Sequence, residues 1–253
     1  MKRFALALGL ASMALAGGTA LADAQAPDAI PLSLSWQLSI DAQGHVAHLQ
    51  ATPDKRADRM PQVRAAVEKK IRGWQFVPGS VDGQPQATET VLSVSMTLLA
   101  QQGDDYQIRI DDARTGAAIG KTLPPRYPTD AVRSGASGLV VMHVDFDGNG
   151  KVTAAQADTG ETKAGASLVK AALDGVKTWT FLPERVGGHG IAGSTLLPVC
   201  FQVMPVGFMG PNAHRPPPCA WTPPGHRGAL AQGESIGVDP VAKLATDVVD
   251  HTL

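Results

Sequence analysis

Residues 124–203 read PPRYPTDAVRSGASGLVVMHVDFDGNGKVTAAQADTGETKAGASLVKAALDGVKTWTFLPERVGGHGIAGSTLLPVCFQV, and this stretch decides the fold. It opens with a Tyr-Pro pair before a short helix that begins near Thr129. Apolar and polar residues then alternate over 140–144, as in a half-buried strand. The Gly-rich turn Asp147–Gly150 and a second strand over 151–156 complete a predicted hairpin.

The second half of this stretch predicts a helix and a final strand. Four apolar residues recur at spacings of 4, 4 and 3, which is one face of an α-helix: Leu168, Ala172, Val176 and Trp179. The sequence Trp-Thr-Phe-Leu-Pro at 179–183 ends the helix, and alternation over 195–203 predicts the last strand. These elements favour an α+β domain in which a small antiparallel sheet packs against a helix.

Residues 32–98 repeat most of this pattern. A shift of 105 positions places Val63, Val67, Ile71, Trp74, Phe76 and Pro78 on Leu168, Ala172, Val176, Trp179, Phe181 and Pro183. The same shift carries Leu92, Val94, Met96 and Leu98 onto Leu197, Val199, Phe201 and Val203. A register shared by helix and strand indicates a duplication. We therefore expect two tandem α+β domains, at 31–100 and 124–204, with a linker at 101–123 that contains a short strand over 106–110.

The C-terminal tail, residues 205–253, differs in composition from both domains. Its prolines and glycines leave too little apolar surface for the tail to fold alone. A short helix is predicted over 240–249. Trp221 either docks on a domain or stays in solvent.

The first 22 residues resemble a secretory signal peptide. Lys2 and Arg3 precede an apolar run over 4–16, and Ala20-Leu21-Ala22 forms a small-residue cleavage signal. We expect cleavage before Asp23 and export of the mature chain, with an uncleaved membrane anchor as the alternative. The mature chain keeps 20 basic and 23 acidic residues without a basic block, which argues against nucleic acid as a partner.

Export would bring the two cysteines, Cys200 and Cys219, into an oxidising compartment. A disulfide between them would tie the tail to the last strand and contribute ~3 kcal/mol to stability. The alternative is two unpaired thiols.

Two near-matches to ligand-binding motifs fail on their context. Residues 145–150 resemble the start of a calcium loop, but the twelfth position is Gln156 rather than Glu. Residues 116–122 are one residue short of a phosphate loop, and the following prolines forbid its helix. The chain shows no recognisable metal-ligand spacing. We expect neither an enzyme nor a bound cofactor or metal.

The second domain resembles the C-terminal domain of the TonB family, the energy transducers of Gram-negative bacteria. The features that carry this resemblance are Tyr127-Pro128 before a short helix, Val144-Asp145 before the turn, the Trp-Thr-Phe-Leu-Pro segment, and Pro198 in the last strand. The first domain is similar to the same domain without the Tyr-Pro helix.

The resemblance implies a periplasmic protein that binds peptides by strand addition. TonB domains pair the TonB box of an outer-membrane receptor with an exposed sheet edge, where backbone hydrogen bonds give affinity. This comparison assigns peptide binding to the Tyr-Pro region and the last strand: Arg126, Tyr127, Pro128, Thr195, Leu197, Val199 and Phe201. The expected partner is a TonB-dependent receptor or another envelope protein. The ExbB–ExbD motor is expected only if the N-terminal segment remains as an inner-membrane anchor, and the alternative function is a periplasmic adaptor without energy transduction.

Overall fold

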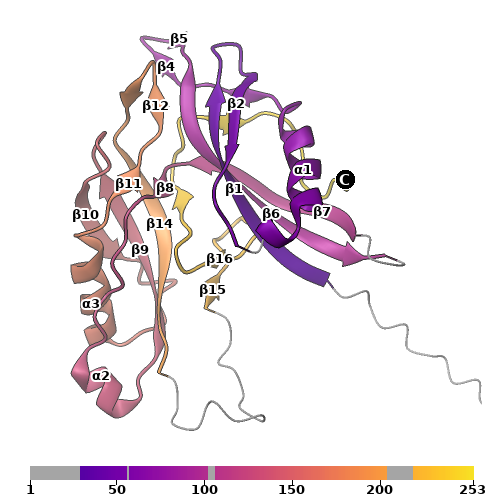
Figure 1. The fold of residues 1–253 in the computed structure, drawn as a ribbon. Helices are drawn as coiled ribbons and strands as arrows, with labels where there is room; N and C mark the ends of the chain where they lie inside the picture. The colour runs from indigo at the N-terminus through magenta and orange to yellow at the C-terminus, as the bar shows by residue number, and fades with distance from the viewer. Residues whose placement is uncertain (1–28, 56, 102–105, 204–218) are drawn as a thin grey trace, which may run out of the picture.

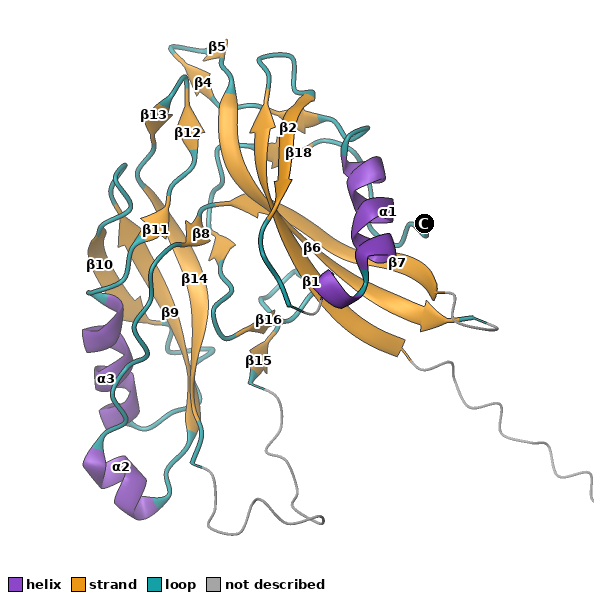
Figure 2. Cartoon of the chain, viewed as in Figure 1, coloured by secondary structure: helices purple, strands orange, loops and turns teal. Residues whose placement is uncertain are grey.

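Two antiparallel sheets dominate the structure, a computed structural model that describes residues 29–55, 57–101, 106–203 and 219–253 (Figure 1). The predicted signal peptide (1–22) and the start of the predicted tail (205–218) lie outside these residues. Each sheet carries a helix on its outer side, and the C-terminal segment starts between the two sheets and ends on the side of the first sheet that carries α1 (Figure 2). None of the described helices is long and apolar enough to cross a membrane.

The first sheet has the strand order β13-β12-β6-β1-β2, and β7 also pairs with β6. Its strands are β1 (Ala29–Ile40), β2 (Val46–Ala51), β6 (Thr88–Ala100), β7 (Tyr106–Gly116), β12 (Arg185–Val186) and β13 (His189–Gly190). Between β2 and β6 lie η1 (Ala57–Arg59), α1 (Pro61–Ile71), β3 (Phe76–Val77), β4 (Ser80–Val81) and β5 (Gln84–Pro85). We call β1 to β6 the first unit.

The second sheet is smaller and has the order β10-β9-β14-β17. Its strands are β9 (Gly138–Phe146), β10 (Val152–Ala157), β14 (Gly193–Phe201) and β17 (Ile236–Gly237), and its helices are α2 (Thr129–Ser134) and α3 (Ala166–Val176). Short pairs join β8 (Ala118–Ile119) to β11 (Phe181–Leu182), β15 (Ala220–Trp221) to β16 (Leu230–Ala231), and β18 (Lys243–Leu244) to β3. We call α2 to β14 the second unit.

Both helices bury the apolar face that the 3.6-residue period predicts. Val67 and Ile71 of α1 have no exposed surface, and neither do Leu168 and Val176 of α3. Each such side chain contributes about 1.5–3 kcal/mol of apolar burial. This burial holds each helix on its sheet and creates one core per unit.

The two units have matching element bounds. Helix α1 and strands β3, β4 and β5 begin and end 105 residues before α3, β11, β12 and β13. The hairpin turns match as well, since the carboxylates of Asp41 and Asp147 each accept two backbone N–H groups, two and four residues further along the chain. This side-chain bonding of a turn is typical of aspartate.

A glycine in each turn touches the strand after the helix. Gly44 and Gly150 have φ values of +88° and +80°, which favour glycine. A Cβ atom at either position would lie 2.0 Å from the carbonyl oxygen of Phe76 or Phe181, respectively. The carbonyl of each glycine also accepts the N–H of that same phenylalanine, at 2.9 and 2.8 Å. Turn, helix and sheet are therefore locked together in the same way in both units.

The predicted linker is mostly regular structure. Residues 106–116 form β7, which pairs with β6 from Val91 to Ala100 and extends well past the strand expected at 106–110. The helix predicted over 240–249 is wrong. The N–H groups of Val241 and Ala242 bind the Glu184 carboxylate, and β18 then pairs with β3, so these donors are used outside a helix.

The linker and the tail cross between the units in opposite directions. After pairing with β6, the linker continues into β8 and pairs with β11 of the second unit. After pairing with β14, the tail continues into β18 and pairs with β3 of the first unit. The two segments touch where they cross, because a Cβ atom on Gly116 would lie 3.3 Å from the Cα atom of Gly237. Each unit is thus completed by a segment that leaves the other.

Candidate functional site

The candidate site is the edge of β14 that faces away from β9. Strand β14 pairs with β9 along its whole length, from Gly193 to Phe201. On the other side, the N–H of Val238 donates to the Ser194 carbonyl at 3.0 Å. Because backbone groups alternate along a strand, the even-numbered residues direct their N–H and C=O groups to this edge. Pro198 is one of them and has no N–H to offer.

Four of the β14 residues assigned to peptide binding direct their side chains into the core. Thr195 and Leu197 are fully buried, and Val199 and Phe201 are at most 4% exposed. Apart from Thr195, they pack with α3 in the core of the second unit. These four side chains therefore belong to the core, and the assignment of these residues to peptide binding stays a prediction. The even-numbered residues of β14 instead direct their backbone N–H and C=O groups to the edge, because both the side chains and the backbone groups of a strand alternate in direction from one residue to the next.

The tail covers the outer face of this sheet. Trp221, Leu230 and Ile236 form a small apolar cluster with Val141 of β9. The indole N–H of Trp221 donates to the Glu161 carboxylate at 2.7 Å. Trp221 is 5% exposed, so of the two alternatives for this residue the structure has it docked.

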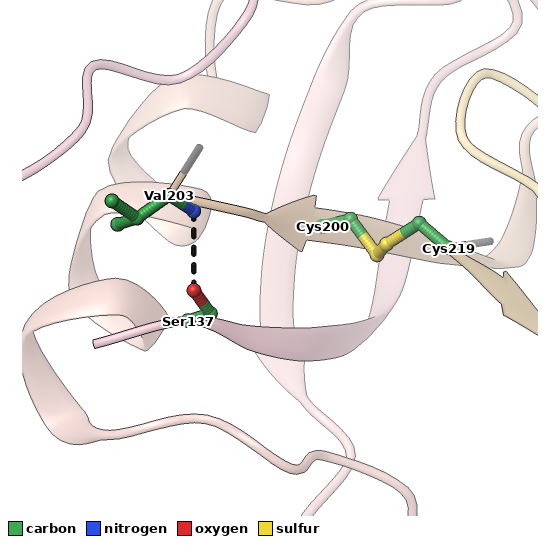
Figure 3. The surroundings of a disulfide bond; sticks show 4 residues. All are labelled: Ser137, Cys200, Val203 and Cys219. Carbon is green, nitrogen blue, oxygen red and sulfur yellow. Dashed lines mark hydrogen bonds between the residues drawn. A yellow bond between two sulfur atoms is a disulfide. The ribbon is translucent and has the colours of Figure 1, made fainter. Parts of the chain in front are cut away.

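A disulfide bond joins the tail to the end of β14, between Cys200 and Cys219 (Figure 3). This is the pairing that the sequence favoured over two unpaired thiols. Just beyond it, the N–H of Val203 donates to the Ser137 hydroxyl at 3.1 Å, which fixes the end of the strand beside the start of β9. The tail therefore starts its return path at one end of the candidate edge.

The Tyr-Pro region lies beside the same end of β14. The Tyr127 hydroxyl donates to the Ala136 carbonyl at 2.5 Å, and its ring meets Phe201 edge-on at a centroid distance of 5.3 Å. Pro128 precedes the first turn of α2, and Arg126 is exposed. The structure thus brings two of the predicted residues, Tyr127 and Phe201, into contact and leaves Arg126 available to solvent.

A buried carboxylate that the sequence did not single out joins three segments. Glu184 is 7% exposed and accepts the Thr90 hydroxyl of β6 and the Val241 amide of the tail, each at 2.7 Å. Burial raises the pKa of Glu184 above its ordinary value, although these hydrogen bonds oppose the shift. The position that matches Glu184 in the first unit is Gly79. This difference between two otherwise similar segments was the one signal in the sequence that could have pointed to Glu184.

The two near-matches to ligand motifs adopt other structures. The Asp147 carboxylate is used within its own turn by the amides of Asn149 and Lys151. Residues 116–122 run through the end of β7 and through β8 rather than around a phosphate. Within the described part of the chain, no group of three or more His, Cys, Asp or Glu side chains is placed to hold a metal ion.

Comparison with known proteins assigns a family to part of the chain. Residues 124–203 match the family described as the Gram-negative bacterial TonB protein C-terminal. Over 80 residues the chain is 37% identical to the protein TonB of Xanthomonas campestris pv. campestris, in strain B100 and in a second strain. The aligned region is 32% of this chain and 35% of each relative, so the chain spans about a third of the length of these curated relatives. No solved structure matches the chain. The chain thus contains one TonB C-terminal domain, at 124–203, that is distantly similar to TonB.

Proposed function

We propose that this protein binds extended peptide segments of the TonB-box type by strand addition at the β14 edge. TonB C-terminal domains interact with TonB-dependent outer-membrane receptors, so the proposed role belongs to transport across the outer membrane. One observation carries the proposal. Among the described residues, no strand pairs with this edge beyond Leu196, although β14 continues to Phe201.

The edge offers a peptide mainly backbone hydrogen bonds. Beyond Leu196, Cys200 directs both an N–H and a C=O to this side, whereas Pro198 contributes only a carbonyl. Backbone pairing of this kind gives affinity with little sequence preference, and neighbouring side chains add selectivity. Arg126 and the Tyr127 ring lie near the far end of the strand and would supply part of that selectivity.

The test is a titration of the isotopically labelled chain with peptides from the N-terminal segments of TonB-dependent receptors of the same cell. The expected result is a shift of the Cys200 amide signal, because Cys200 lies beyond the residues that β17 covers. The first unit supplies an internal control, because β7 already covers the corresponding edge of β6, so the amides of Val91 and Ser95 should not move. Unchanged β14 amides at millimolar peptide would exclude strand addition.

We infer that the first unit is a second, diverged copy of the TonB C-terminal domain. The matching bounds of helices and short strands support this inference, as do the equivalent turn glycines Gly44 and Gly150. The boundaries proposed from the sequence, 31–100 and 124–204, need one revision, since β7 and the tail belong to the packed structure.

A second candidate function is a periplasmic adaptor that keeps the fold without energy transduction. It is favoured by the intramolecular strands on both edges, since β7 covers β6 and β17 covers the start of β14. Both candidates place the protein in the cell envelope after export, with residues 1–22 as signal peptide or membrane anchor. Cell fractionation combined with mass spectrometry of the N-terminus separates these two forms, and only the anchored form could engage ExbB–ExbD.

A further inference from the structure

Strand β17 pairs with β14 in the register that β7 uses on β6. Leu196 of β14 pairs with Ile236, and Val91 of β6 pairs with Gly116. Leu196 and Val91 are 105 residues apart, the same spacing that relates the two units. The tail therefore occupies the equivalent position on the equivalent strand.

A threonine contact marks this equivalence. The Thr195 hydroxyl donates to the Ile236 carbonyl at 2.8 Å, and the Thr90 hydroxyl accepts the Gly116 N–H at 3.1 Å while it donates to Glu184. Thr195 and Thr90 are again 105 residues apart, and both are buried. A buried threonine hydroxyl thus bonds to the backbone of the neighbouring strand at the same point in each unit.

The two edges differ in how much of them is covered. Strand β7 pairs with ten residues of β6, Val91 to Ala100, whereas β17 pairs only with Thr195 and Leu196. Upstream of Ile236, the tail leaves the edge and crosses the outer face as the β15–β16 hairpin. Strand β17 is thus a short substitute for the long strand of the first unit.

The tail is fixed on both sides of β17. Upstream, Trp221 binds Glu161, and the disulfide holds the start of the hairpin. Downstream, the amides of Val241 and Ala242 bind Glu184. A segment between two fixed points can leave its strand partner and return to it without a loss of the surrounding structure.

We propose that β17 is an internal strand that a partner peptide displaces from the edge of β14. This proposal rests on the proposed function and describes the regulation of that same site. The displacing peptide would run antiparallel to β14 and place an apolar side chain where Ile236 is buried, against Val141 and Leu230. The next residue would be small, because Gly237 lies against the backbone of Gly116.

The test compares Val238→Pro with Val238→Ala in the full-length chain. The Val238 side chain is half exposed, while its N–H binds the Ser194 carbonyl, so proline removes the hydrogen bond and alanine keeps it. The probe is a labelled synthetic peptide with the chain's own residues 233–239, Gly-Glu-Ser-Ile-Gly-Val-Asp. The proline variant should bind the probe about fivefold more tightly than the alanine variant, the effect of losing one backbone hydrogen bond in the competing strand.

A second variant protects the test against misfolding of the proline chain. Ile236→Ser removes the apolar anchor of β17 but keeps every backbone group, and it should strengthen probe binding in the same direction. Hydrogen exchange gives a measurement without any probe. The Val238 amide should exchange faster than the amides of β14 that bind β9, because β17 opens without the rest of the sheet.

The outcomes separate this proposal from the proposed function. Tighter probe binding by both weakened chains supports displacement, even if no receptor peptide binds and the proposed function fails. Receptor peptides that bind the wild-type and Val238→Pro chains equally would overturn displacement and leave the proposed function standing. Absence of probe binding by any variant, or equal exchange of the Val238 and β14 amides, would overturn it as well.

Discussion

Replacing Gly150 with alanine tests the contact that locks the hairpin turn to the strand after α3. At φ +80° an alanine pays about 1–2 kcal/mol for the left-handed conformation alone. Its Cβ would also lie 2.0 Å from the Phe181 carbonyl oxygen, which is too close for any real contact. The strand must move, and the 2.8 Å hydrogen bond from the Phe181 amide to the Gly150 carbonyl is lost. This loss adds about 1–3 kcal/mol, so the total is about 2–5 kcal/mol.

The matched control is Gly188→Ala in the same unit. Gly188 has φ +84°, but a Cβ atom there would meet nothing within 4 Å. The Gly188 variant should lose only the roughly 1–2 kcal/mol of stability that the left-handed backbone conformation costs an alanine. Urea unfolding followed by tryptophan fluorescence measures both free energies, and the Gly150 variant should lose about 2 kcal/mol more than the control. Equal losses would refute the claim that the turn and the strand are in tight contact.

The first unit allows the same comparison. Gly44→Ala should behave like the Gly150 variant, because its Cβ would also lie 2.0 Å from a carbonyl oxygen, that of Phe76. Its control is Gly83→Ala, with φ +74° and nothing within 4 Å. A large loss at Gly150 together with a small one at Gly44 would contradict the structural equivalence of the two units.

Three further predictions concern the site and its supports. Tyr127→Phe should lower the free energy of unfolding by about 1 kcal/mol in thermal denaturation, because the hydrogen bond to Ala136 is lost; Tm values equal to wild type would contradict it. Burial raises the pKa of Glu184, so stability from its protonation is present below the ordinary value of 4.5 and is lost as pH rises through the folded-state pKa. The free energy of unfolding of Glu184→Gln should therefore fall less than that of the wild-type chain as pH rises over this range. Identical pH profiles for the two chains would be inconsistent with the raised pKa. Cys219→Ser should lower the free energy of unfolding by about 3 kcal/mol, because it opens the loop between two cysteines that are 19 residues apart. The double variant with Cys200→Ser should lose little more, because either change breaks the same disulfide, and additive losses would argue against that bond.

Local pattern was sufficient for α1, α2, α3 and the two hairpin turns, but it also predicted a helix over 240–249 that the structure does not have. The burial of Val67 and Ile71 follows from their spacing, because a helix needs only one apolar face to find its sheet. The turn glycine Gly150 follows from the Asp-Gly-Asn-Gly sequence before it. These features depend on interactions between residues that are close in the chain, so the local sequence is sufficient to predict them.

Strand β7 shows why part of the fold could not be predicted. Asp112 and Arg114 look like solvent-exposed residues of a linker, but they pair with each other at 3.0 Å and are buried where the tail packs on the sheet. His226 of the tail also contacts Asp112, at 3.0 Å. A strand covered on both faces loses the alternation that identifies strands, and the tail residues that cover β7 lie more than a hundred residues away in the sequence.

The sequence pattern predicts the strand of the candidate site but not its backbone edge. Alternation along β14 distinguishes two faces, but it does not say which backbone groups point to a free edge. Val199 was therefore assigned to peptide contact although it belongs to the core, and Cys200 was considered only as a disulfide partner. The covering of Leu196 by Ile236 depends on a tail whose isolated apolar residues form no pattern of their own.

The crossing of the linker and the tail has a consequence for the order in which the protein is made. Chains are synthesised from the N-terminus, and domains generally fold as they emerge. Strand β8, which pairs with β11 of the second unit, is synthesised before the strands of that unit, whereas Phe76 of the first unit cannot pair until Leu244 has been synthesised. The unit made first is therefore finished last. A nascent chain stalled before residue 244 would lack the strand that pairs with β3 of the first unit. A premature stop codon in the tail would therefore destabilise the N-terminal half of the polypeptide.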